Sequence, residues 1–157
     1  MTKHNFLIVL VILVYGIFNL FFGEVLLVAN GFGWDGQTYR DIARNFPQLV
    51  FEKQQDSYSV QRIVPSGIIY YSHKLLKVRL TDESILMGFK IYNLTLIVLA
   101  VHVYCLIADY LKFGVRETWL GFVCLFFNFA IAKLYFYTPA STDQTAFTLG
   151  YLCYFSF

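Results

Sequence analysis

Residues 85–111 read ILMGFKIYNLTLIVLAVHVYCLIADYL, an apolar stretch long enough to cross the ~30 Å hydrocarbon core of a bilayer as one helix, with Asp82 as its expected N-cap. Before it, residues 6–22 (FLIVLVILVYGIFNLFF) form a second run without a charge. After it, residues 119–137 form a third run and residues 146–157 begin a fourth. The fourth run is too short to cross a bilayer. We therefore expect an N-terminal fragment with three complete spans and a truncated fourth.

The overall composition is that of a membrane protein. Of the 157 residues, 58% are hydrophobic and 14% are charged, and the mean hydropathy is +0.58. Soluble domains average about 45–50% apolar and about 25% charged residues. The aromatic content of 20% suits the two membrane interfaces. A net charge of +2 excludes a nucleic-acid binder that works by electrostatics. The predicted fold is an all-α integral membrane protein, a multi-span helical bundle whose single transmembrane domain includes residues 1–157.

The segment at residues 6–22 has one alternative interpretation, which is a cleaved signal peptide. Its apolar run, however, is longer than the usual ~7–15 residues of such a signal.

Residues 23–84 form a long first loop that carries most of the charged residues. We expect two short helices within it. One covers residues 37–46 and ends at Pro47, and the other covers residues 63–76 and lies along the membrane interface, because it is too short for a span.

The sidedness of the loops follows from the number of crossings. Lys3, Lys112 and Arg116 fit a cytoplasmic location, which places the long loop outside the cytoplasm. The loop also contains seven basic residues, so charge alone leaves the orientation undecided. With either orientation, three alternating crossings bring the long loop and the turn at residues 138–143 to the same side of the membrane.

Three motifs gather on that shared side: WDGQTYRDIA at residues 34–43, QRIVP at residues 61–65 and TPASTDQ at residues 138–144. In content, order and spacing they resemble the GT-C superfamily of membrane glycosyltransferases, which take sugars from polyprenyl-phosphate or polyprenyl-diphosphate carriers. Many bacterial members carry an aromatic-Asp-Gly-Gln run just after the first helix. The resemblance implies an inverting hexosyltransferase that transfers a sugar from a polyprenyl-phosphate donor to a glycan, lipid or protein acceptor at the extracytoplasmic face. It favours the bacterial inner membrane over the endoplasmic reticulum.

The resemblance also assigns roles to single residues. Asp35 and Asp143 are the candidate catalytic residues, and they are candidate ligands of a divalent ion, Mg²⁺ or Mn²⁺. A guanidinium matches phosphate oxygens, so Arg62 is the expected phosphate partner. The full set of candidate substrate-binding residues is Trp34, Gln37, Tyr39, Gln61, Arg62 and Lys133. We expect both carboxylates to converge on one cavity at the membrane surface, with Arg62 or Lys133 on its lipid side.

Simpler interpretations compete with these roles. Asp35 and Asp143 each precede a predicted helix and could serve only as helix caps. At the level of the whole protein, the alternatives are a small multi-span transporter or channel subunit, with His102 and Lys90 on its conduction path, and a non-catalytic membrane scaffold. Ionisable residues concentrate in the loop and not in the spans, which favours chemistry at the interface.

Overall fold

Every element in the described part of the chain is helical, as the sequence predicts. The structure is a computed structural model, and it describes residues 2–52, 63–141 and 143–154. The elements in chain order are α1 (Lys3–Phe22), η1 (Val28–Gly31), α2 (Gly33–Arg44), η2 (Gln48–Glu52), α4 (Val64–Leu76), α5 (Asp82–Tyr110), α6 (Val115–Phe126), α7 (Phe129–Ala132), α8 (Leu134–Tyr137) and α9 (Asp143–Tyr154). No strand occurs within these ranges.

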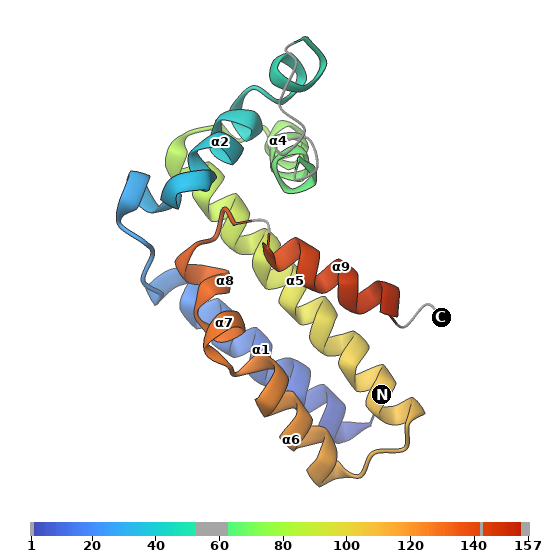
Figure 1. The fold of residues 1–157 in the computed structure, drawn as a ribbon. Helices are drawn as coiled ribbons and strands as arrows, with labels where there is room; N and C mark the ends of the chain where they lie inside the picture. Colours follow the sequence, from blue (N-terminus) through green and yellow to red (C-terminus); the bar gives the residue numbers. More distant parts are fainter. Residues whose placement is uncertain (1, 53–62, 142, 155–157) are drawn as a thin grey trace.

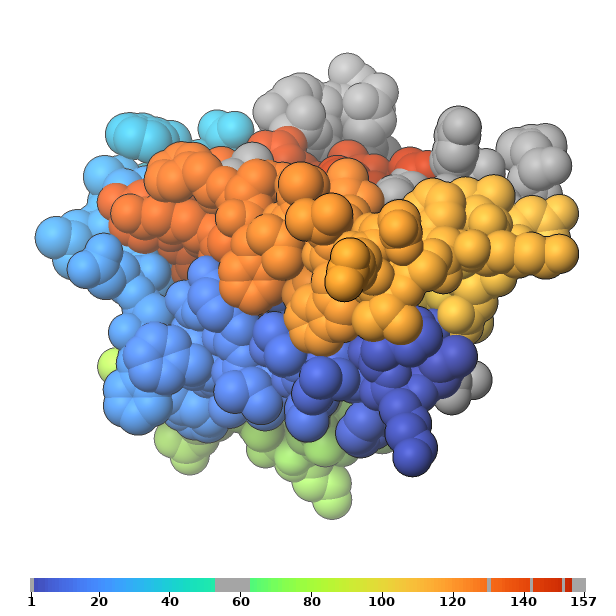
Figure 2. All heavy atoms as spheres, turned by 90° about the horizontal axis from the view of Figure 1, so that it is seen from below, coloured from blue at the N-terminus to red at the C-terminus, as the bar shows by residue number. Residues whose placement is uncertain are grey.

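Two helices, α1 and α5, are long and apolar enough to cross a bilayer. Only 22% of the apolar window of α1 and 39% of that of α5 is buried inside the protein. A core helix of a soluble protein would be mostly covered, whereas fewer than half of the residues in each of these windows are buried. The helices lie side by side with α6 (Figure 1). The view from below shows the atoms of α1, in blue, directly against those of α6, in orange (Figure 2).

The predicted third span, residues 119–137, is not one continuous helix. Its helical path begins earlier, at Val115, and is divided into α6, α7 and α8. The first break occurs at Asn128, whose amide donates to the carbonyl oxygen of Leu125 (2.8 Å) and whose oxygen accepts from the backbone N–H of Ile131 (3.0 Å). One side chain thus ends α6 and caps α7. Asparagine favours such local bonds over a helix interior, which hydropathy does not detect.

A buried asparagine on α5 supplies hydrogen-bond donors at the end of α8. Asn93 is 1% exposed, and its Nδ2 donates to the carbonyl oxygens of Tyr135 and Pro139, both at 2.8 Å. The first carbonyl belongs to α8 and the second to the turn that follows it. A carbonyl that a broken helix leaves without a partner is costly in an apolar environment. Asn93 therefore fixes the position of α8 and of the turn against α5.

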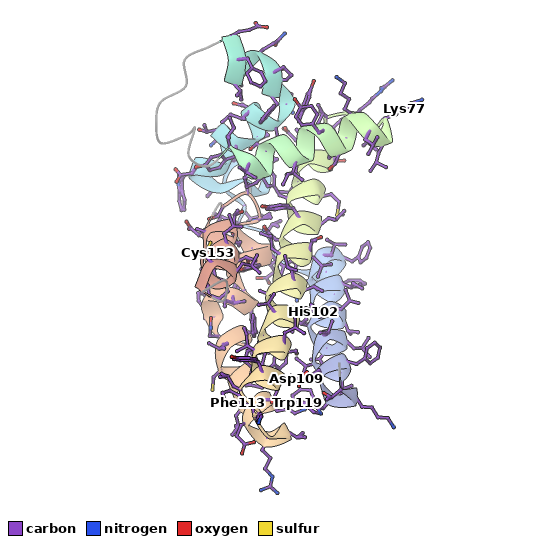
Figure 3. All side chains as sticks on the ribbon, turned by 90° about the vertical axis from the view of Figure 1, so that its right-hand side faces the viewer. Lys77, His102, Asp109, Phe113, Trp119 and Cys153 are labelled. Carbon is purple, nitrogen blue, oxygen red and sulfur yellow. The ribbon has the colours of Figure 1, made fainter. Side chains whose placement is uncertain are left out.

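The two helices of the long loop lie at one end of the bundle. The predicted helix at residues 63–76 is confirmed as α4, and Figure 3 shows it lying across the end of α5, with Lys77 at its tip. The other predicted helix, residues 37–46, starts earlier as α2, at Gly33. The expected cap at Asp82 is displaced by one residue. Thr81 caps α5 instead, through reciprocal bonds with Ser84.

The buried apolar residues form two separate cores. The bundle core joins α1, α5 and α6–α8, and its buried residues are Ile8, Ile12, Ile97, Ala100, Val101, Tyr104, Cys105, Phe122, Phe126, Ile131, Tyr135 and Phe136. The cap core joins α2 and α4 to the start of α5, and its buried residues are Phe32, Tyr39, Ile42, Ala43, Phe46, Ile69, Ile85, Phe89 and Ala140. Ala140 belongs to the turn after α8, so this turn lies where the cap meets the bundle.

Replacing Asn93 tests this account of the fold. We expect Asn93→Leu to lower the free energy of unfolding by roughly 2–4 kcal/mol, because two buried carbonyls lose their donor. The matched control is Thr95→Ala on the same helix, since the exposed Thr95 hydroxyl donates only to Ile91 within α5. Denaturant unfolding in detergent micelles would measure both changes. Equal stability of the two variants would contradict the proposed role of Asn93.

Candidate functional site

The site lies where the start of α2 covers the turn at residues 138–141. The backbone N–H of Leu26 donates to the carbonyl oxygen of Tyr137 at 2.9 Å, which ties the chain before α2 to the end of α8. A Cβ added at Gly36 would lie 2.8 Å from the Cβ of Ala140. Only glycine allows this approach of α2 to the turn. Figure 1 shows α2 above the loop that joins α8 to α9.

The approach to α2 uses backbone conformations that few residues adopt. Ala29 and Asn30 have φ values of +52° and +57°, and Gly33, the first residue of α2, has a φ of +72°. Glycine has no steric penalty in this region, and asparagine tolerates it better than most residues. Ala29 has neither property, so its conformation costs about 1–2 kcal/mol. The left-handed turn directs α2 back over the bundle.

One cavity of about 230 Å³ is lined by both candidate carboxylates. Its lining consists of Leu26, Phe32, Gly33, Trp34, Asp35, Gly36, Tyr39, Thr138, Ser141 and Asp143. The first seven residues come from the long loop, and the last three come from the turn and α9. Residues about a hundred positions apart in the sequence therefore line one cavity.

Asp35 differs in position from the expected helix cap. It is the third residue of α2, so it lies inside the first turn of the helix, and the N-cap position is occupied by Phe32. The Asp35 side chain is exposed and has no hydrogen bond or ion pair with the residues that the structure describes. A carboxylate in the first turn interacts favourably with the helix dipole. Its oxygens are available to a ligand.

Asp143 is the first residue of α9 and is held by Ser141. The Ser141 hydroxyl donates to Oδ2 of Asp143 at 3.0 Å and accepts from the backbone N–H of Asp143 at 3.4 Å. One oxygen of the carboxylate is thereby positioned by a neighbouring hydroxyl. The Asp143 side chain is exposed and borders the cavity described above.

The other candidate residues fall into three groups. Trp34 and Tyr39 line the cavity, Trp34 with 74% of its surface exposed and Tyr39 almost fully buried. Gln37 is exposed on α2 and is not part of the cavity lining. Gln61 and Arg62 lie outside the described residues.

Lys133 also stands apart from the cavity. Its ammonium lies over the ring of Tyr137, 5.0 Å from the centroid, and it does not line the cavity. This cation–π contact holds the charge one helical turn before the cavity-lining residue Thr138. The side chain is exposed, so it remains accessible from outside.

Basic residues of α2 are engaged elsewhere. Arg44 forms an ion pair with Asp82 at the start of α5, and Arg40 pairs with Asp41 at 2.8 Å and lies 3.7 Å from Asp82. These pairs attach α2 to α5. Among the described lining residues, the cavity has two carboxylates and no Lys or Arg. Two anions at one small cavity repel each other unless a cation, a proton or a hydrogen-bond donor lies between them.

The carboxylates of Asp35 and Asp143 can be compared with the ligands that a divalent metal ion requires. No group of three or more His, Cys, Asp or Glu side chains with metal-binding geometry occurs in the described ranges. Mg²⁺ is commonly held by only one or two carboxylates, with waters and substrate phosphates as its other ligands. Asp35 and Asp143 meet that smaller requirement, so the residues present fit a metal that binds together with its substrate.

Two further cavities occur in the described part of the chain. A large apolar groove of about 630 Å³ lies between α4 and α5, lined by residues such as Ile68, Leu76, Met87 and Ile91. A smaller cavity of about 180 Å³ lies between α8 and α9 and shares Thr138, Ser141 and Asp143 with the first. Sequence reasoning did not select Ser141 or Gln144 from this turn. The only available signal was their position beside Asp143 at the start of a helix.

The residues expected for a conduction path are arranged differently. His102 is exposed on the surface of α5 (Figure 3), and neither His102 nor Lys90 lines any of the three cavities above. The three cavities described above therefore do not include either residue in their lining.

Comparisons with protein-family models, with curated proteins and with solved structures found no match to this chain. The functional argument consequently depends on the site itself.

Gly36 provides a direct test of the site geometry. We expect Gly36→Ala to destabilise the protein by about 1–3 kcal/mol, because the new methyl group would overlap Ala140. Adding Ala140→Gly should restore most of the lost stability in the double variant. Gly150→Ala is the control, since nothing lies within 4 Å of a Cβ at that position. Denaturant unfolding of Gly36→Ala, of Ala140→Gly alone and of the double variant gives the coupling energy. No coupling between positions 36 and 140 would show that α2 and the turn are not in contact.

Proposed function

We propose that this chain is part of a membrane glycosyltransferase of the GT-C type, which transfers a sugar from a polyprenyl-phosphate carrier to an acceptor hydroxyl. The observation that supports it best is the shared cavity of Asp35 and Asp143. Such an enzyme needs a carboxylate base beside the acceptor, and it needs this base at the end of membrane helices, where the carrier phosphate emerges. The proposal is also supported by the aromatic rings of Trp34 and Tyr39 in the cavity lining and by the order of the three motifs.

The proposed reaction is a single displacement at the anomeric carbon. Asp35 accepts the proton of the acceptor hydroxyl, and the acceptor oxygen forms a bond to the anomeric carbon. The bond from that carbon to the phosphate oxygen breaks, and its electron pair leaves with the polyprenyl phosphate. The transition state resembles an oxocarbenium ion, as in glycoside hydrolysis. Attack from the face opposite to the leaving group inverts the configuration at that carbon.

Asp143 would orient the acceptor from the other side of the cavity, because Ser141 fixes one of its oxygens. The exposed ring of Trp34 offers a wall on which a sugar can stack. The leaving phosphate requires positive charge, for which we retain Arg62 and Lys133 as partners. A divalent ion, Mg²⁺ or Mn²⁺, would be held by Asp35 and Asp143 and would neutralise phosphate charge.

The membrane arrangement is part of the proposal. In it, α1 and α5 are the first two crossings, and α6–α8 together form the third, since Asn93 and Asn128 satisfy the backbone groups at its breaks. The helix α4 lies in the interface, and the apolar groove between α4 and α5 suits the prenyl chain of the carrier. The cap formed by α2 and α4 faces the extracytoplasmic side, with the bacterial inner membrane as the favoured location.

Conservative replacement of Asp35 tests the catalytic role. We expect Asp35→Asn to reduce transfer from radiolabelled polyprenyl-phosphate hexoses by at least 100-fold, because general-base catalysis typically contributes about 10²–10⁴-fold. The matched control is Asp41→Asn on the same helix, which pairs with Arg40 and does not line the cavity. Membranes that contain equal amounts of each variant would be compared. If Asp35→Asn keeps nearly normal transfer, the catalytic assignment is wrong.

Cysteine labelling tests the orientation. In a background in which Cys105, Cys124 and Cys153 are replaced by serine, we expect Thr38→Cys to react with a membrane-impermeant maleimide in intact cells. Arg116→Cys, beyond the opposite end of α5, should react only after lysis. Both positions are exposed, so burial does not limit either reaction. The reverse pattern would invert the proposed topology, and labelling of both positions in intact cells would contradict an odd number of crossings between them.

A further inference from the structure

The cavity between α8 and α9 contains more free hydrogen-bond acceptors than free donors. Its polar side chains come from Thr138, Ser141, Asp143, Gln144 and Tyr135, and the rest of its lining is Ile131, Leu134 and Phe147. Gln144 is 3% exposed, and its Oε1 has no hydrogen-bond partner within the described residues. A buried amide oxygen without a donor is costly, so its surroundings indicate what can bind there.

The orientation of the Gln144 amide is fixed by its nitrogen. Nε2 lies 3.3 Å from the carbonyl oxygen of Leu134 and 3.4 Å from that of Thr138. Both partners are acceptors, so the NH₂ group must face them and the amide cannot be turned around without placing oxygen against oxygen. The Oε1 atom is therefore held in position by two contacts on the other side of the amide.

The hydroxyl protons around the cavity are already in use. The Thr138 hydroxyl donates to the carbonyl oxygen of Leu134 at 3.2 Å, and the Ser141 hydroxyl donates to Oδ2 of Asp143 at 3.0 Å. The Tyr135 hydroxyl lies 3.4 Å from both the carbonyl oxygen of Gln144 and the hydroxyl oxygen of Thr148. The capacity that remains consists of acceptors, namely Oε1 of Gln144 and the carboxylate of Asp143. A ligand at this place has to donate hydrogen bonds or carry positive charge, and of these two the acceptor of the proposed reaction supplies hydroxyl donors.

We infer that the cavity between α8 and α9 is a subsite for a hydroxyl-rich ligand, the acceptor sugar or polyol, and that Gln144 is its positioning residue. This inference rests on the proposed function. A phosphate group is excluded by the same chemistry, because it would bring acceptors to acceptors beside a carboxylate. Asp143 borders both this cavity and the one that contains Asp35. A hydroxyl on a ligand bound here can reach the shared wall between them. Together the two volumes fall within the range of about 300–1,000 Å³ that is usual for ligand sites.

Binding of simple glycosides tests this subsite without any transfer assay. The protein would be prepared in a phosphocholine detergent, which carries no sugar head group, with methyl-labelled isoleucine and leucine. We expect methyl hexopyranosides to shift the NMR signals of Ile131 and Leu134, which line the cavity. The corresponding fluoro-deoxy analogues, which cannot donate at the altered position, should bind about tenfold more weakly for at least one hydroxyl.

The variant Gln144→Met should weaken glycoside binding by about tenfold. The same change at Gln48, an exposed glutamine that lines none of the cavities described here, should leave glycoside binding unchanged. The fluoro-analogue series needs no variant, so it decides the matter even if Gln144→Met fails to fold. The inference is overturned if glycosides leave Ile131 and Leu134 unshifted, if fluoro analogues bind as well as their parents, or if MgCl₂ or inorganic phosphate shifts these signals and glycosides do not.

The two proposals fail in different ways. If Asp35→Asn abolishes transfer but Gln144→Met binds glycosides normally, the proposed function is retained and this subsite is rejected. Glycoside binding that depends on Gln144, together with normal transfer by Asp35→Asn, would reject the catalytic assignment of Asp35 and retain the subsite.

Discussion

The pair of hydrogen bonds from Asn93 to the carbonyl oxygens of Tyr135 and Pro139 determines where the rest of the molecule lies. The helical path after α5 is broken, and a broken helix in an apolar environment needs donors for its free carbonyls. Because one amide supplies both donors, α8 and its following turn have a single position on α5. That turn carries Ala140, against which α2 packs. The turn's side of the cavity depends on this contact, whereas the cap also packs directly on α5 through Ile85 and Phe89.

The site combines features that are individually ordinary. Carboxylates in the first turn of a helix are common, and so are short turns between helices. What distinguishes this cavity is that two such helix starts face it, while the arginines of α2 are occupied by Asp82. The result is a small region rich in acceptors with no basic side chain in its described lining. Such a region favours ligands that donate hydrogen bonds, and it directs anionic groups toward its edges.

Much of the fold could be predicted from the sequence because hydropathy and helix length are strong signals. The ranges of α1, α4 and α5 agree with the predicted segments to within a few residues. The division of the third run could not be predicted, since Asn128 acts through its own side-chain bonds and hardly changes the mean hydropathy of the run. For the site, the sequence predicted that Asp35 and Asp143 lie at the same end of the helices, and both residues line one cavity there. The role of Gln144 does not, because it depends on which carbonyls face its amide.

The packing of α1 against α5 has a consequence for biosynthesis. Ile8 and Ile12 of α1 share the bundle core with Ile97 and Val101 of α5, yet the whole cap segment is synthesised between them. During translation α1 is therefore complete long before α5 exists, and in that interval α5 cannot cover the apolar side chains of α1. Closing so long a loop has an entropic cost, which grows slowly with length. The ion pairs of Arg40 and Arg44 with Asp82 join α2 to the beginning of α5, so they hold the loop at the point where it re-enters the bundle.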